Sequence, residues 1–229
     1  MSSTIDKHNN ILKEITEFKK KKKITSKTNI IAVSKTFPPE KILPLLKAGH
    51  REFGENKVQE AFHKWAKLKQ DFKNVNLHLI GPLQSNKVKN ALEIFDCIQT
   101  LDREKIVLKI SDYIINQKQH IKIKHKFMVQ VNIDEEPQKS GLKLNQVVEF
   151  VNWSKFDIGI NIIGLMCIPN FEKDPTSSFK ILNSLAEKCN LKDKSMGMSK
   201  DYLSAINCGS NYIRIGTSIF GERTNKSTT

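Results

Sequence analysis

The segment "IIAVSKTFP" (residues 30–38) places a lysine two residues after a short apolar run and three residues before a proline. The run from Ile30 to Val33 is typical of a strand that is buried on both faces, as strands of parallel sheets are. Pro38 and the next residue, also a proline, end this strand and begin another element. The segment therefore predicts an interior strand with Lys35 at its carboxyl end.

Seven further segments repeat this apolar pattern along the chain. With the first, they are the expected strands 29–34, 51–55, 76–81, 96–100, 126–133, 161–168, 194–199 and 211–217. Stretches with helical periodicity lie between them, at 39–49, 56–70, 86–95, 103–117, 144–154, 176–190 and 200–209.

Regular alternation of strands and helices indicates parallel strands joined by crossover helices. Eight strands predict an α/β fold of one domain over residues 1–229, a closed (β/α)8 TIM-type barrel with an extra N-terminal helix. An open, doubly wound sheet is the alternative. No G-x-G-x-x-G turn follows the first strand to favour that alternative.

Length and composition agree with one soluble domain. A chain of 229 residues can form one large core, and its longest apolar stretches, such as 162–168, are too short to span a membrane. The polar start lacks the apolar core of a signal peptide, so we expect a cytoplasmic protein. Its four cysteines are scattered, which favours reduced thiols, and the histidines show no metal-ligand spacing.

The net charge of +14 raises the possibility of a nucleic-acid-binding protein. Residues 1–27 alone carry eight lysines against three carboxylates, a net +5, and the lysines at 19–23 are consecutive. Apolar residues recur there at helical spacing, so we expect a basic amphipathic helix whose lysines lie at the negative end of its dipole. Aromatic residues are not interleaved with these lysines as a single-strand binder requires, so nucleic acid is not an expected partner.

In a β/α barrel the carboxyl ends of all strands meet at one face, so residues distant in sequence become neighbours there. Lys35 would lie at this face, either as a solvated surface group or as a desolvated amine able to attack an aldehyde. Ser199 is expected to begin a helix as its N-cap, and Gly216 with Thr217 to form a turn. These can be ordinary structural features or a cradle for a phosphate. Arg214 alternates with isoleucines and should point into the barrel, where we expect a ligand or a carboxylate to pair with it.

A set of collinear motifs spans the chain from Ile30 to Arg223. They are "IAVSKTFP" (31–38), "FGENKVQE" (53–60), "HLIGPLQSNK" (78–87), "VNIDEEPQKSGL" (131–142), "GLMCIP" (164–169), "SMGMSKDYLSAINCGS" (195–210) and "RIGTSIFGER" (214–223). Together they resemble the pyridoxal phosphate homeostasis protein family, also called the proline synthase co-transcribed family. Its members have a single β/α barrel similar to the N-terminal domain of alanine racemase and hold pyridoxal 5′-phosphate (PLP).

The resemblance implies a role for six residues. Lys35 is implied to form the Schiff base with PLP, Ser199 and the Gly216–Thr217 backbone to hold its phosphate, and Arg214 to face the pyridine nitrogen, while Asn56 lines the cofactor. Lys57 departs from the family pattern, in which an aromatic or another basic residue is usual, and receives no role.

An arginine cannot keep the ring nitrogen protonated, because its own pKa is above ~12, so the ring should be a weak electron sink. Alanine racemases also use, as a second base, a tyrosine from a second domain. This chain ends soon after the last motif, and we expect none of its three tyrosines, Tyr113, Tyr202 and Tyr212, to lie at the mouth that holds Lys35. We therefore expect a non-catalytic PLP carrier or buffer that acts in PLP homeostasis as a monomer and passes the cofactor to apo-enzymes. The alternatives are a PLP-dependent racemase, a lysine aldolase or a nucleic-acid-binding module.

Overall fold

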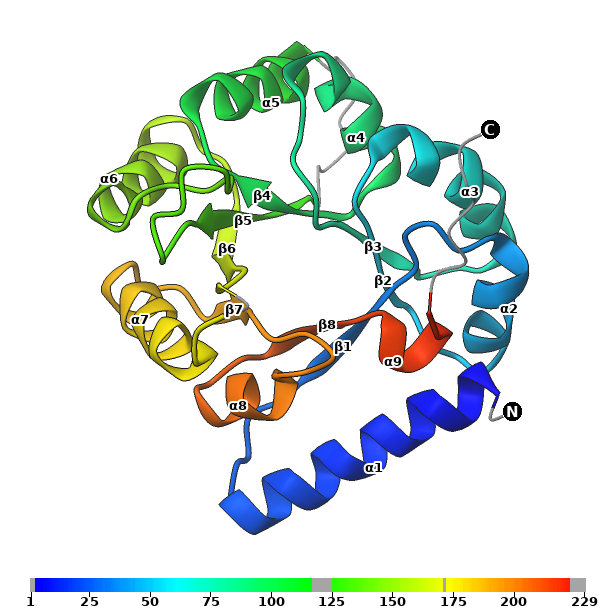
Figure 1. The fold of residues 1–229 in the computed structure, drawn as a ribbon. Coiled ribbons are helices and arrows are strands. Elements are labelled where there is room, and N and C mark those ends of the chain that lie inside the picture. Colours follow the sequence, from blue (N-terminus) through cyan, green and yellow to red (C-terminus); the bar gives the residue numbers. More distant parts are fainter. Residues whose placement is uncertain (1–2, 117–124, 171, 223–229) are drawn as a thin grey trace.

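The computed structural model describes residues 3–116, 125–170 and 172–222, and within them eight parallel strands close into a barrel (Figure 1). The strands are β1 (Asn29–Val33), β2 (Glu52–Glu55), β3 (Asn76–Leu79), β4 (Cys97–Leu101), β5 (Lys126–Val131), β6 (Ile162–Cys167), β7 (Asp193–Ser195) and β8 (Tyr212–Ile215). Each strand pairs with the next in sequence, and β8 pairs with β1 to complete the ring. The (β/α)8 barrel predicted from the sequence is therefore confirmed, and the open sheet is wrong.

Helices surround the strands on the outside of the barrel (Figure 1). In the described ranges they are α1 (Thr4–Lys22), α2 (Pro39–Lys47), α3 (Val58–Asp71), η1 (Ser85–Lys87), α4 (Val88–Ile94), α5 (Glu104–Asn116), η2 (Leu144–Gln146), α6 (Val147–Asn152), η3 (Trp153–Asp157), α7 (Pro175–Lys188), α8 (Tyr202–Asn207) and α9 (Thr217–Phe220).

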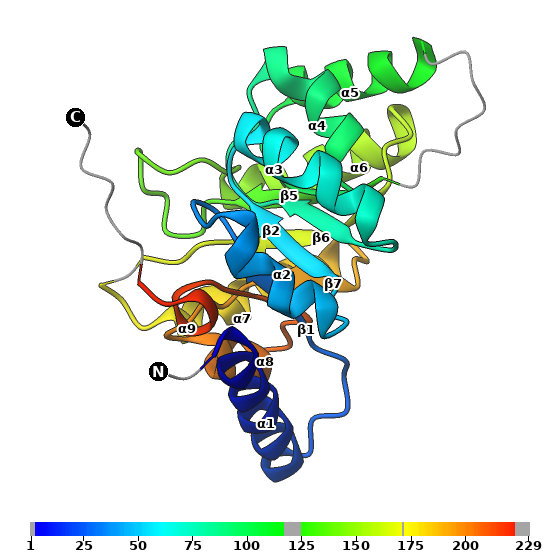
Figure 2. The ribbon, with the colours of Figure 1, turned by 90° about the vertical axis from the view of Figure 1, so that its right-hand side faces the viewer.

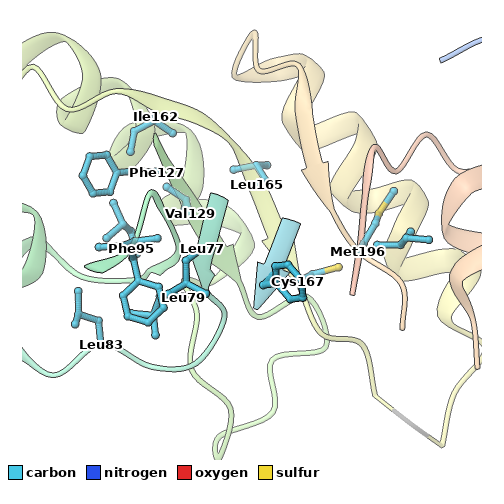
Figure 3. Close-up of a cluster of buried hydrophobic side chains, with 14 of the residues drawn as sticks. Leu77, Leu79, Leu83, Phe95, Phe127, Val129, Ile162, Leu165, Cys167 and Met196 are labelled. Carbon is cyan, nitrogen blue, oxygen red and sulfur yellow. The ribbon is translucent and has the colours of Figure 1, made fainter. Parts of the chain in front are cut away.

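Alternation along the strands divides the buried side chains into two groups. Figure 3 shows one group, in which Leu77 and Leu79 of β3 lie with Phe127 and Val129 of β5 and with Phe95, which precedes β4. These residues belong to the large apolar core, to which the surrounding helices also contribute. The intervening residues of the same strands point into the barrel.

The barrel interior has a much smaller apolar cluster of its own. Cys97, Met128 and Met166 form it, and Tyr212 packs against it. Polar side chains fill much of the remaining interior, and the buried ones include His78, Gln99, Gln130, Ser195 and Arg214. A TIM barrel interior is usually filled by branched apolar residues. The interior of this barrel is therefore more polar than the usual interior of a TIM barrel.

The basic N-terminal segment forms α1, which packs against α2, α8 and α9 below the barrel in the view of Figure 2. Its first turn has a capping box, in which Ser3 and Asp6 exchange hydrogen bonds of 3.1 and 2.9 Å. Its last turn holds four lysines, at the negative end of the helix dipole. Ile11 and Ile15 are buried. The predicted amphipathic helix is confirmed over residues 4–22.

Among the predicted elements that differ from the structure, two bear on the site. The helix expected over 200–209 covers only Tyr202–Asn207, so Asp201 and not Ser199 occupies the N-cap position. The seventh strand ends at Ser195, because the backbone of Gly197 has φ +93° and leaves the extended conformation. Gln117 and Arg223, the ends of an expected helix and of the last motif, lie outside the described residues, as do residues 1–2.

Candidate functional site

The carboxyl ends of the parallel strands bring the predicted site residues to one mouth of the barrel. Lys35 lies two residues after β1, and Asn56 directly follows β2. Gly216 and Thr217 follow β8 at the start of α9. Because Ala32 of β1 is in register with Ile215 of β8, the loops after these two strands are neighbours. A Cβ atom added at Gly216 would lie 3.5 Å from the Val33 carbonyl oxygen.

The backbone on both sides of Lys35 is held by hydrogen bonds from α3 and β2. The Lys64 ammonium donates to the Ser34 carbonyl at 2.9 Å, and the Thr36 N–H donates to Glu60 at 2.6 Å. The Ser34 hydroxyl donates to the Glu55 carboxylate at 2.7 Å. Thr36 has φ +68°, a conformation that costs a β-branched residue on the order of 1–3 kcal/mol. The loop that carries Lys35 is therefore fixed in a strained conformation by its surroundings.

A buried ion pair is the centre of this support. Lys64 lies 2.9 Å from Glu55 and 3.0 Å from Glu60, and the side chains of Lys64 and Glu55 are 7% and 0% exposed. Trp65 also donates its indole N–H to Glu55 at 3.0 Å. Burial raises the pKa of Glu55 above its usual value, and these hydrogen bonds together with the Lys64 charge oppose that rise. We call Glu55, Glu60 and Lys64 the loop clamp.

Asn56 offers a hydrogen-bonding atom to the mouth. Its side-chain oxygen is buried and has no hydrogen-bond partner in the part of the chain that the structure describes. The Asn56 backbone lies against Gly81, where an added Cβ would be 2.3 Å from the Asn56 carbonyl oxygen. Only glycine permits this approach of the loops after β2 and β3. An unsatisfied buried acceptor is costly, so this atom fits a bound polar ligand.

Arg214 points into the barrel, as the alternation of β8 predicts. It is 4% exposed, and it donates to the Ser195 hydroxyl and to the Cys167 carbonyl, each at 2.7 Å. Burial lowers its pKa from the usual value. Two neutral oxygens, and not the expected carboxylate, accept these hydrogen bonds, while a ligand beside this guanidinium stays a prediction.

Ser199 lies in the turn between β7 and α8 rather than at a helix cap. This turn is fixed by the Asp201 carboxylate, which accepts the Met198 N–H, and by the Gly197 carbonyl, which accepts the Arg214 N–H at 2.9 Å. Ser199 and Ser218 line a common cavity of about 380 Å³ beside α1. The turn after β7 is therefore adjacent to α9 and close to the strand that carries Arg214.

The three tyrosines lie in different parts of the structure. Tyr202 donates its hydroxyl to Glu14 of α1, Tyr212 is the first residue of β8, at the opposite mouth, and Tyr113 lies in α5 on the outside of the barrel. Tyr113 and Tyr212 thus lie away from the mouth that holds Lys35, whereas Tyr202 lines the same cavity as Ser199 and its hydroxyl is bonded to Glu14.

Several supporting residues were not found from the sequence. Glu55 and Asn56 belong to the same motif, but only Asn56 was singled out. Lys64 reads as one more surface lysine of a helix, and Ser195 and Gln99 show no pattern of their own. The available signal was alternation: Gln99, Ser195 and Arg214 occupy inward positions of their strands, where polar residues are unusual.

The described ranges hold neither a membrane-spanning helix nor a cluster of metal ligands. No helix there is long and apolar enough to cross a bilayer. Nor do three or more histidine, cysteine, aspartate or glutamate side chains of those ranges gather as metal ligands. All four cysteines are free thiols.

Comparison with known proteins assigns the barrel to a class. The family model "Alanine racemase, N-terminal domain" matches residues 10–224, which is most of the chain. An alanine racemase from Acinetobacter baumannii has the same fold, with a TM-score of 0.69 at 16% identity, and its similarity covers 95% of this chain and 62% of the racemase chain. The fold and the site thus define a barrel of the alanine racemase N-terminal domain class.

More similar relatives narrow this class. The pyridoxal phosphate homeostasis protein of Pasteurella multocida is 40% identical over 88% of this chain and 89% of its own. PipY of Synechococcus elongatus, whose structure is known with PLP bound, is 29% identical with a TM-score of 0.75, covering 90% of this chain and all of PipY. The chain belongs to the family of pyridoxal phosphate homeostasis proteins.

Proposed function

We propose that this protein binds PLP through Lys35 and limits the concentration of the free aldehyde in the cell, without catalytic turnover. The observation that carries the proposal is the fixed loop around Lys35 at the mouth of a barrel whose relative PipY binds PLP. The names of the curated relatives support a role in PLP homeostasis.

The residues at the mouth fit this cofactor chemically. PLP supplies an aldehyde, which a lysine amine can attack, together with a phosphate and a polar ring. The Lys35 amine fits the aldehyde, and the hydroxyls of Ser199 and Thr217 with the backbone of Gly216 fit the phosphate. The unsatisfied oxygen of Asn56 fits a polar group of the ligand.

In this proposal each residue has one task. Lys35 would hold the cofactor through its amine, because an amine condenses with an aldehyde with loss of one water and hydrolysis reverses this, which would let the cofactor pass to apo-enzymes. Arg214 would face the ring nitrogen and would not protonate it, because a guanidinium gives up its proton only at very high pH. The loop clamp keeps the Lys35 loop in place before the cofactor arrives, which lowers the entropic cost of binding.

The position of the tyrosines favours a carrier over a racemase. Racemisation needs a base on each face of the substrate carbon, and Lys35 can serve only one face. The Tyr202 hydroxyl is bonded to Glu14 and Tyr212 lies at the other mouth, which supports the absence of a second base. The free thiols fit a reducing compartment such as the cytoplasm. We also expect the protein to be a monomer, and analytical ultracentrifugation measures its oligomeric state.

Titration of the purified protein with PLP and an activity assay test the proposal together. We expect a saturable visible absorption band, transfer of PLP to an added PLP-requiring apo-enzyme, and no racemisation of alanine. The same assays on Lys35→Ala should show no band and only weak, dialysable binding. Racemase turnover that disappears in Lys35→Ala would establish an enzyme instead, and a protein that never binds PLP would refute both readings.

A further inference from the structure

A continuous chain of hydrogen bonds crosses the interior of the barrel. Five side chains from five strands form it: Glu52 of β2, His78 of β3, Gln99 of β4, Ser195 of β7 and Arg214 of β8. The successive distances are 2.7 Å from Glu52 to His78, 3.0 Å from His78 to Gln99, and 2.7 Å from Gln99 to Ser195 and from Ser195 to Arg214. All but Glu52 are buried.

The chemistry of these groups gives the chain one direction. Arg214 can only donate, so the Ser195 oxygen accepts from it and the Ser195 hydroxyl donates to the Gln99 carbonyl oxygen. The Gln99 amide then donates to Nδ1 of His78, which leaves Nε2–H of His78 to donate to Glu52. Every donor therefore points from Arg214 toward Glu52, and this direction places a ring proton of His78 at Nε2.

The chain connects the two mouths of the barrel. Glu52 is the first residue of β2, at the mouth opposite to Lys35. At the other end, Arg214 also donates to the carbonyl of Cys167, the last residue of β6. Burial alone would raise the pKa of Glu52, but the hydrogen bonds from His78 and Asn76 together with the interactions with the His78 and His50 rings outweigh it, so the pKa lies below its usual value. The hydrogen-bond chain therefore runs from the positive guanidinium of Arg214 to the negative carboxylate of Glu52.

Packing does not require this chain. The neighbouring interior positions are filled by Cys97, Met128 and Met166, so this barrel accommodates apolar side chains. A buried polar network stabilises a protein only when each member is satisfied, and it then fixes one arrangement of its groups. Here the group that the network fixes at the mouth of Lys35 is the guanidinium of Arg214.

We propose that Ser195, Gln99, His78 and Glu52 are positioning residues for Arg214, which set the orientation of its guanidinium toward a ligand ring at the mouth of the barrel. Ser195 makes the contact, and the other three fix the direction in which the Ser195 hydroxyl points. The effect on the ligand rests on the proposed binding of PLP, whereas the coupling between Arg214 and His78 is a property of the protein alone.

The first test uses the protein without PLP. In ¹⁵N-labelled protein, NMR should show His78 protonated at Nε2 only. Arg214→Met and Ser195→Ala should both shift the His78 ring nitrogens. Ser210→Ala is the matched control, because Ser210 is equally buried and, within the described residues, its hydroxyl contacts the backbone carbonyls of Lys194, Met196 and Tyr212 and no side chain. Protonation at Nδ1, or a His78 signal unchanged in Arg214→Met and Ser195→Ala, would overturn the proposal.

The second test adds PLP. Ser195→Ala and Gln99→Leu should move the visible band in the same direction as Arg214→Met and by less, while borohydride still attaches the cofactor to Lys35. Ser210→Ala should leave the band in place. A band that moves in none of the three, or in Arg214→Met alone, would overturn the positioning role, and circular dichroism confirms that each variant is folded. If wild-type protein fails to bind PLP, the proposed function is wrong. The NMR experiment without PLP still tests whether Arg214 and His78 are coupled through the hydrogen-bond chain.

Discussion

Replacing Lys64 by methionine should destabilise the protein and weaken PLP binding together. Methionine keeps the approximate length of the side chain but leaves the fully buried Glu55 carboxylate without its cation, and it removes the donor to the Ser34 carbonyl beside Lys35. Removing one partner of a buried ion pair costs about 3–5 kcal/mol. For a chain of this length that corresponds to a fall in Tm of roughly 6–20 °C.

A matched control lies on the same helix. Lys69 is also an ion-paired lysine of α3, but its partner Asp96 is at the other end of the barrel, and their side chains are 24% and 40% exposed. Lys69→Met should therefore cost only about 0–1 kcal/mol and leave PLP affinity unchanged. The double variant Glu55→Gln with Lys64→Met removes both buried charges and should recover part of the lost stability.

Urea unfolding followed by circular dichroism gives the free energies, and titration of the visible band gives the dissociation constants. The expected order of stability is wild type, Lys69→Met, the double variant and Lys64→Met. If Lys64→Met unfolds at the same urea concentration as Lys69→Met and binds PLP as wild type does, the loop clamp does not hold the Lys35 loop and the reasoning is wrong.

Three further predictions concern pH, the phosphate and the contact between loops. Burial, followed by the proximity of His8, lowers the pKa of His50 from 6.5 to about 4. As the pH falls, the unfolded chain therefore takes up the proton first, and the free energy of unfolding should fall by about 2–3 kcal/mol between pH 6.5 and pH 4. Urea titrations of wild type and His50→Phe measure this fall, and an equal fall in the variant would refute the prediction. Ser199→Ala should weaken PLP binding on the order of tenfold to a hundredfold, as the loss of one hydrogen bond to a phosphate predicts, while the band position stays the same; equilibrium dialysis that finds wild-type affinity would exclude Ser199 from the phosphate site. Gly81→Ala should lower both Tm and PLP affinity, because the new Cβ would meet the Asn56 carbonyl at 2.3 Å; a calorimetric Tm equal to that of wild type would contradict this close approach.

The barrel could be predicted because its signals are local and repeated. Each strand has a short apolar run, each connection has a helical period, and parallel strands need such crossovers. The inward direction of Arg214 follows from strand alternation in the same way. The early end of β7 could not be read from "KSMGMS", because its apolar residues continue past Gly197, where the backbone turns.

The support of the site was harder to predict, since it depends on pairs of residues that are distant in sequence. Lys64 resembles the many other lysines of the chain until the fold places it between Ser34 and Glu55. The chain from Glu52 to Arg214 joins five strands, and a single strand shows only one of its members. Ser199 was assigned to a helix cap because serine favours caps, but the Asp201 carboxylate accepts the Met198 N–H and fixes the turn before α8.

The central claim is that Lys35 is the residue that holds PLP. Borohydride reduction of the PLP-loaded protein, followed by proteolysis and mass spectrometry of the peptides, tests it most directly. We predict that the reduced cofactor is found on the peptide that contains Lys35, in a ratio approaching one per chain, and that Lys35→Ala carries none. A cofactor attached to a different lysine, or a Lys35→Ala protein labelled as fully as wild type, would contradict the account.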